Sequence, residues 1–113
     1  MGYYLDWAKD GKDWPNHQAS RFVDAAGMPW HVQVMGEGPA ILLLHGTGAA
    51  THSWRDVMPK LAGHYTVVAL DLPGHAFTQP PSKNSLSLPG MAAAVATLLR
   101  TLNVYPEIGR AHV

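Results

Sequence analysis

The run His45-Gly46-Thr47-Gly48 has the strongest potential for chemistry in this sequence, and it directly follows the apolar stretch Ile41–Leu44. A strand that ends in a His-Gly-x-Gly turn can direct a backbone N–H towards a negatively charged oxygen. Such a donor is one half of an acyl-transfer active site. The other half would be a Ser, Cys or Asp nucleophile on a sharp turn after a later strand. No Gly-x-Ser-x-Gly sequence occurs in the 113 residues, and the serines lack a strand–turn–helix context.

The elements that must position this turn follow from hydrophobic periodicity. Arg21–Asp24 and Pro29–Met35 are expected to form a hairpin, with Gly27 supplying a positive φ in its turn. Polar and apolar residues alternate along the second of these strands, as in an antiparallel outer strand, so His31 is interpreted as a strand-face residue rather than a ligand. Pro59 should kink or split the helix in which it occurs. The later elements are expected at Ile41–Leu44 (strand), 51–63 (helix), Tyr65–Leu70 (strand) and 87–102 (helix).

This order of elements predicts an α/β fold, in which an antiparallel β-hairpin edge precedes a parallel βαβ unit and a further helix. Because parallel crossovers are right-handed, helices that lead the chain in opposite directions must cover opposite faces of the sheet. The strand Ile41–Leu44 would then lie beside a reversal in strand order. Open α/β sheets bind ligands at such a point, beyond the C-terminal ends of the strands, and His45 lies at that end.

The composition excludes several classes of function. Of the 113 residues 47% are hydrophobic and 14% are charged, as in one globular domain. The formal net charge is zero and no basic run occurs, so we expect no nucleic-acid partner and no anionic-membrane surface. The absence of cysteine excludes disulfides and thiolate metal sites. No signal peptide or membrane-spanning run is visible, which makes a cytoplasmic location the default expectation.

Residues 1–20 are polar with scattered aromatic side chains and are interpreted as a lead-in arm. The aromatic residues are Tyr3, Tyr4, Trp7 and Trp14. They could cap a ligand pocket or pin the arm to the sheet. We favour the second interpretation, because large apolar rings are usually buried.

Two turns together resemble the N-terminal third of the α/β-hydrolase family. They are the His-Gly-x-Gly turn at 45–48 and Asp71-Leu-Pro-Gly-His75, which begins about 26 residues later with a helix between them. A narrower resemblance, over roughly residues 7–106, is to the magnesium-chelatase accessory proteins of bacteriochlorophyll biosynthesis. It adds the runs Trp14-Pro-Asn, Ser20-Arg-Phe-Val, Trp30-His-Val-Gln, Thr51-His-Ser-Trp-Arg55, Phe77-Thr78 and Leu86-Ser-Leu-Pro-Gly-Met91. Gly is expected after His75, where this chain has Ala76, and a positive φ there would carry a cost.

The resemblance implies roles for residues of both turns. The backbone N–H of Thr47 would help to hold an oxyanion, in a substrate-binding turn that also contains His45, Gly46 and Gly48. The catalytic His and acid of the family come later in chain order. We therefore expect His45 to hydrogen-bond its surrounding loop and Asp71 to brace its own turn.

Three further side chains near these turns have alternative interpretations. His75 could pair with Asp71, although two residues are too few for a metal site. His52 and Trp54 could line the mouth of a pocket, but Trp54 also fits the apolar stripe of its helix and is interpreted as core. We expect neither a bound metal nor a cofactor.

The resemblance leaves two functions open for the parent protein. The first is a serine hydrolase that cleaves an ester or amide of a small-molecule substrate. The second is a non-catalytic accessory protein that holds a porphyrin intermediate or assists magnesium chelatase. Fold alone does not decide between them, whereas a downstream Gly-x-Ser-x-Gly elbow with a later Asp and His would favour the enzyme. Nucleophile, acid and base are not in this chain, so we expect these residues alone to be inactive.

The resemblance stops near Pro106, where a buried strand leading to the nucleophile elbow is expected. The chain instead continues Glu107-Ile-Gly-Arg-Ala-His-Val113. This run matches a translation of the start of a widely used short-read sequencing adapter, and the alternative is a genuine terminus. We therefore expect a lead-in arm (1–20), a partial α/β-hydrolase domain (21–106) truncated before the nucleophile-elbow strand, and an adapter-derived tail (107–113).

Overall fold

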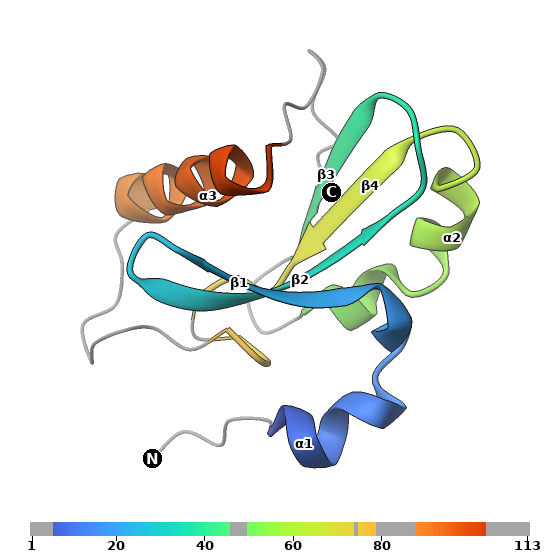
Figure 1. Ribbon diagram of the computed structural model, residues 1–113, viewed down its shortest axis with the longest axis horizontal. Helices are drawn as coiled ribbons and strands as arrows, with labels where there is room; N and C mark the ends of the chain where they lie inside the picture. Colours follow the sequence, from blue (N-terminus) through green and yellow to red (C-terminus); the bar gives the residue numbers. More distant parts are fainter. Residues whose placement is uncertain (1–5, 46–49, 74, 79–87, 104–113) are drawn as a thin grey trace.

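A four-stranded mixed sheet forms the centre of the molecule in a computed structural model, which describes residues 6–45, 50–73, 75–78 and 88–103 (Figure 1). Its strands are β1 (Ser20–Ala25), β2 (Met28–Met35), β3 (Ala40–Leu44) and β4 (Thr66–Leu70). The helices are α1 (Trp7–Asp10), α2 (Val57–Leu61) and α3 (Leu88–Leu102), with 3₁₀ turns η1 (Gly11–Asp13), η2 (His17–Ala19) and η3 (Thr51–Trp54). The strand order is β1-β2-β4-β3, and only the pair β3–β4 is parallel. The predicted α/β class is confirmed.

The hairpin β1–β2 closes over two residues, Ala26 and Gly27, which have φ values of 52° and 79°. Positive φ at both central positions is the type I′ geometry, whose twist matches that of the flanking strands. The positive φ predicted for Gly27 is confirmed. Ala26 adopts the same region although it carries a Cβ.

The structure corrects the prediction that β2 is an outer strand. β2 lies between β1 and β4 and is antiparallel to both. Its polar side chains His31 and Gln33 are completely buried. The alternation along β2 therefore separates two covered faces, one apolar and one polar, rather than a covered face from a solvated one.

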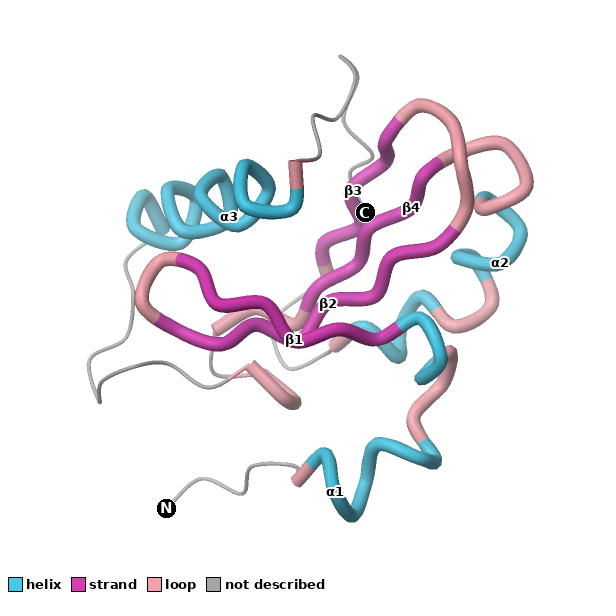
Figure 2. Tube along the Cα trace, viewed as in Figure 1, coloured by secondary structure: helices cyan, strands magenta, loops and turns pink. Residues whose placement is uncertain are grey.

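The two faces of the sheet carry separate hydrophobic clusters. On one face, α3 packs with Ala94 and Leu98 against Trp30, Val32 and Leu70. On the other face, Trp54 and Met58 from η3 and α2 pack against Leu43, Val67 and Ala69. The helices thus cover opposite faces, as the crossover argument predicts, and Figure 2 shows the strands lying between them.

Local breaks in the helices agree with the sequence signals. The predicted split of the 51–63 helix into a short turn and a helix is confirmed, because η3 and α2 replace one continuous helix and the break lies at Arg55 and Asp56. Pro59 is the third residue of α2, within the first turn, where a backbone N–H has no intrahelical acceptor. Asn103 ends α3 in the left-handed conformation, with φ of 59°. No helix in the described ranges is long and apolar enough to cross a membrane.

Candidate functional site

The carboxyl ends of the parallel strands β3 and β4 bring His45 and Asp71 to the same end of the sheet. His45 is buried, and its Nε2 accepts a hydrogen bond of 2.9 Å from the N–H of Leu72. His45 Nε2 thus bonds the loop that follows β4, so this nitrogen is engaged by the protein itself. Gly46, Thr47 and Gly48 of the predicted oxyanion turn lie outside the described residues.

Asp71 is a fully buried carboxylate that ties three segments together. Its Oδ1 accepts the N–H of Thr51 at 2.8 Å, and its Oδ2 accepts the N–H of Phe77 at 3.2 Å. Both donors belong to the main chain. The predicted role of Asp71 as a brace of backbone hydrogen bonds is confirmed.

The side-chain partner of Asp71 is His31, where the sequence had suggested His75. His31 Nδ1 lies 2.6 Å from Asp71 Oδ2, and both side chains are 0% exposed. Because a carboxylate oxygen only accepts, the Nδ1–H of His31 is the donor in this bond. The other ring nitrogen, Nε2, lies 2.8 Å from the hydroxyl of Ser20. His75 instead lies against the ring of His45, with 4.8 Å between ring centroids.

Sequence reasoning missed this pair because β2 and the end of β4 are far apart in the chain. One signal was available. His31 and Gln33 are polar at alternate positions of a strand whose other face is strongly apolar. Buried polar side chains need partners, so their burial would have required hydrogen-bonding groups on neighbouring elements.

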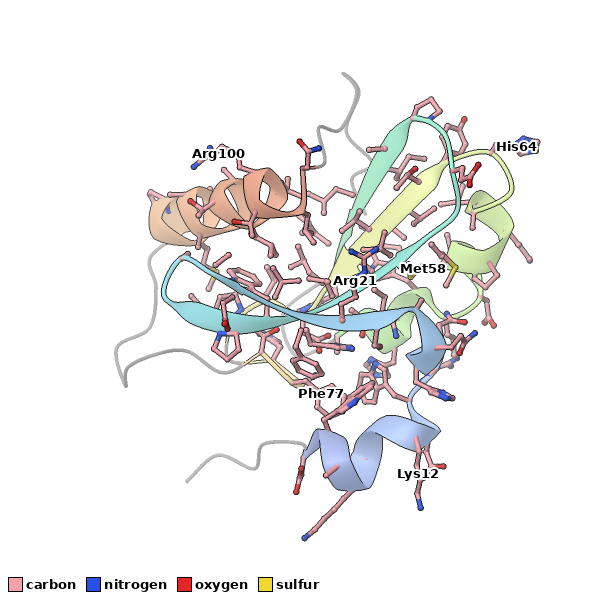
Figure 3. All side chains as sticks on the ribbon, viewed as in Figure 1. Lys12, Arg21, Met58, His64, Phe77 and Arg100 are labelled. Atoms are coloured by element: carbon pink, nitrogen blue, oxygen red, sulfur yellow. The ribbon has the colours of Figure 1, made fainter. Side chains whose placement is uncertain are left out.

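The N-terminal segment covers the polar end of this face. The rings of Trp7 and Trp14 both lie against His31 and Phe77, and Figure 3 shows Phe77 between the α1 segment and the hairpin. Trp14 Nε1–H donates to Thr51 Oγ1 at 2.8 Å, and Gln33 Nε2 donates to the carbonyl of Pro15 at 2.8 Å. Trp7 and Trp14 therefore pin this segment to the sheet, as the favoured interpretation holds. Tyr3 and Tyr4 are outside the described residues.

His52 and Trp54 have different environments. Trp54 is 7% exposed and packs in the core with Leu43 and Met58, which confirms the core interpretation. The ring of His52 lies 5.2 Å from that of Trp14. Within the described ranges, no three His, Asp or Glu side chains form a group that could hold a metal ion.

The loop after β4 contains Ala76, at the position where the family resemblance predicts glycine. His75 O accepts the N–H of Thr78 at 3.0 Å, which closes a tight turn over Ala76 and Phe77. Ala76 has φ of 44°, so the left-handed conformation is present at the expected position. Positive φ at the first central residue alone is the pattern of type II′ turns, which favour glycine there.

A family model described as alpha/beta hydrolase fold matches residues 39–106, which include β3, β4 and both turns at their carboxyl ends. The chain belongs to the α/β-hydrolase fold family. Among curated α/β-hydrolase relatives, the magnesium-chelatase 30 kDa subunit of Rhodobacter capsulatus is 38% identical over 96 residues, covering 83% of this chain and 34% of that protein. The fluoroacetate dehalogenase of a Burkholderia species is 40% identical over 86 residues, covering 73% of this chain and 28% of that protein.

Solved structures agree with this assignment. An epoxide hydrolase from Vigna radiata superposes with a TM-score of 0.69 at 34% identity, over 75% of this chain and 28% of that one. The present chain thus spans about a third or less of the length of these α/β-hydrolase-fold relatives. It corresponds to an N-terminal portion of the fold.

Proposed function

We propose that this chain is part of an α/β-hydrolase-fold enzyme that cleaves an ester or amide through an acyl-enzyme intermediate. A serine Oγ, outside these residues, would attack the carbonyl carbon, and the alcohol or amine would leave with a proton from the catalytic histidine. Water would then release the acid. Within this chain, the turn at 45–48 would supply one oxyanion donor, the backbone N–H of Thr47.

The observation that carries the proposal is the bond from Leu72 N–H to His45 Nε2 at the carboxyl ends of β3 and β4. An oxyanion donor is effective only when it is fixed before charge develops, because reorienting it during the reaction would cost free energy. The bond from Leu72 fixes His45, which is the first residue of the turn at 45–48. His45 is thereby a support for the turn rather than a base.

The test begins with the genomic sequence downstream of the Pro106 codon and uses the complete gene product that it defines. We expect a Gly-x-Ser-x-Gly elbow, labelling by a fluorophosphonate probe, and hydrolysis of p-nitrophenyl butyrate. Thr47→Pro removes the backbone N–H whereas Thr47→Ala keeps it, so kcat should be about 10²–10³-fold lower in the first variant than in the second. Equal kcat values would contradict the oxyanion role. An elbow with neither serine nor cysteine at the nucleophile position would contradict the acyl-enzyme route.

A second function is favoured by one observation, the 38% identity to the magnesium-chelatase 30 kDa subunit over 83% of this chain. In this alternative the protein holds a porphyrin intermediate or assists a magnesium chelatase without turnover. Titration of the complete protein with metal-free protoporphyrin IX, followed by its absorption spectrum, separates the two proposals. Saturable binding together with no fluorophosphonate labelling would replace the hydrolase proposal by this one.

A further inference from the structure

The two residues that flank the segment 46–50, His45 and Thr51, are bonded to two consecutive residues at the end of β4. On the N-terminal side, His45 accepts the N–H of Leu72 at 2.9 Å. On the C-terminal side, the N–H of Thr51 is donated to Asp71 Oδ1 at 2.8 Å. Whatever fixes Asp71 and Leu72 therefore fixes both anchors of the turn.

The carboxylate of Asp71 is held in place by His31. Their 2.6 Å contact is the shortest that Asp71 makes with the described residues, and neither side chain is exposed. His31 is in turn fixed by its main-chain N–H, which donates to Thr78 Oγ1 at 2.9 Å, and by Ser20 at its Nε2. If Asp71 rotated away from Thr51, the Nδ1–H of His31 would lose its acceptor in the interior.

The side chains of Ser20, His31 and Asp71 are hydrogen-bonded in series, as in a hydrolytic triad. Ser20 Oγ lies 2.8 Å from His31 Nε2, and His31 Nδ1 lies 2.6 Å from Asp71 Oδ2. A catalytic role would require room for a carbonyl group beside Ser20 Oγ. That oxygen already lies 3.2 Å from Gln33 Nε2. The imidazole of His31 is completely buried. The aromatic rings around it belong to Trp7, Trp14, Phe22 and Phe77. These contacts favour a supporting role over a nucleophilic one.

We infer that the buried pair His31–Asp71 is a positioning device for the turn at 45–48, acting through the N–H of Thr51, which follows that turn in the chain. The inference rests on the proposed function, in that the turn is the segment that binds the oxyanion. In this role His31 and Asp71 act through Thr51 and not on the substrate itself. Their role is to hold the C-terminal anchor of the turn in one place.

Two amide variants of His31 form a matched pair that isolates the bond to Asp71. The amide nitrogen of Asn replaces Nδ1, so His31→Asn keeps the donor to Asp71 and loses the contact with Ser20. The amide of Gln reaches the place of Nε2, so His31→Gln keeps the contact with Ser20 and loses the donor to Asp71. Both remove the ring, and the exchange of Leu98 reports any general loss of packing that differs between them.

The experiment measures amide hydrogen exchange of Thr51 and, as a reference, of Leu98 in α3, in the complete gene product. We expect Thr51 to exchange roughly tenfold faster in His31→Gln than in His31→Asn, since a buried hydrogen bond is lost only in the first. Leu98, which lies on the opposite face, should exchange equally in both variants. The kcat for p-nitrophenyl butyrate should fall about tenfold to a hundredfold in His31→Gln, with KM within about twofold, and His31→Asn should restore it.

The two readouts separate the possible failures. Equal exchange of Thr51 in the two variants overturns the inference, whatever the activity. Equal acceleration at both Thr51 and Leu98 in the two variants also overturns it, because His31 would then support the fold as a whole. Faster exchange of Thr51 in His31→Gln with unchanged kcat upholds the positioning of the turn and refutes its proposed oxyanion role.

Discussion

Replacing Ala76 by glycine should stabilise the protein, although alanine-to-glycine changes are usually destabilising. Ala76 has φ of 44°, and an L-residue in the left-handed region costs about 1–2 kcal/mol because its Cβ crowds the backbone. Glycine removes that cost but adds about 0.4–1 kcal/mol of freedom to the unfolded chain. The difference is a net gain of about 0.5–1 kcal/mol. The hydrogen bond from Thr78 N–H to His75 O, which closes the turn, involves only main-chain atoms and is retained.

Urea unfolding followed by tryptophan fluorescence measures this effect as a shift in midpoint at constant slope. Two matched variants set the scale. Ala26→Gly, at φ of 52° in the hairpin turn, should also raise the midpoint. Ala92→Gly, at an exposed position inside α3, should lower the free energy of unfolding by about 1 kcal/mol. A loss in Ala76→Gly as large as that in Ala92→Gly would refute the argument from backbone strain.

Two further predictions concern the connections around the sheet. Gly36→Ala should cost about 3 kcal/mol or more, because φ is 87° and the new Cβ would overlap the carbonyl oxygen of Tyr65. Gly27→Ala should cost only about 1–2 kcal/mol, because φ is 79° but no atom lies within 4 Å of the new Cβ. Similar midpoints in urea for these two variants would be evidence against the clash. His45→Ala should lower the free energy of unfolding by about 1–3 kcal/mol because the N–H of Leu72 loses its acceptor. His45→Gln offers an oxygen near the same place and should recover part of this loss in thermal unfolding, and no recovery would argue against the bond to Leu72.

The features predicted from sequence were those with a local chemical cause. Gly27 in a short connection predicted the hairpin turn, and Pro59 predicted the break between η3 and α2. The family resemblance, together with the special backbone freedom of glycine, located the left-handed residue at Ala76. Each of these local conformations depends on a residue and its immediate neighbours, so the sequence contains the information needed to predict it.

The errors concern pairings between distant segments. The polar face of β2 predicted an outer strand, but β4 pairs with β2, and the N-terminal segment covers His31 and Gln33. A polar residue on a strand faces either water or a buried partner, and periodicity cannot distinguish these cases. The partner of Asp71 was missed for the same reason. The oxyanion role of Thr47 lies outside the described residues and stays a prediction.

The hydrogen bonds to Asp71, which together tie three segments of the chain, restrict the amino-acid type at some of the participating positions but not at others. Of the three donors to the Asp71 carboxylate among the described residues, two, at Thr51 and Phe77, are main-chain N–H groups, which every residue except proline possesses. Within the part of the chain that the structure describes, only His31 and Asp71 contribute side chains to this tie. Substitution at 51 or 77 can therefore leave this tie intact, whereas a change at 31 keeps it only if the new side chain still donates a hydrogen bond to Asp71. Divergent proteins can share the arrangement with only two side chains in common.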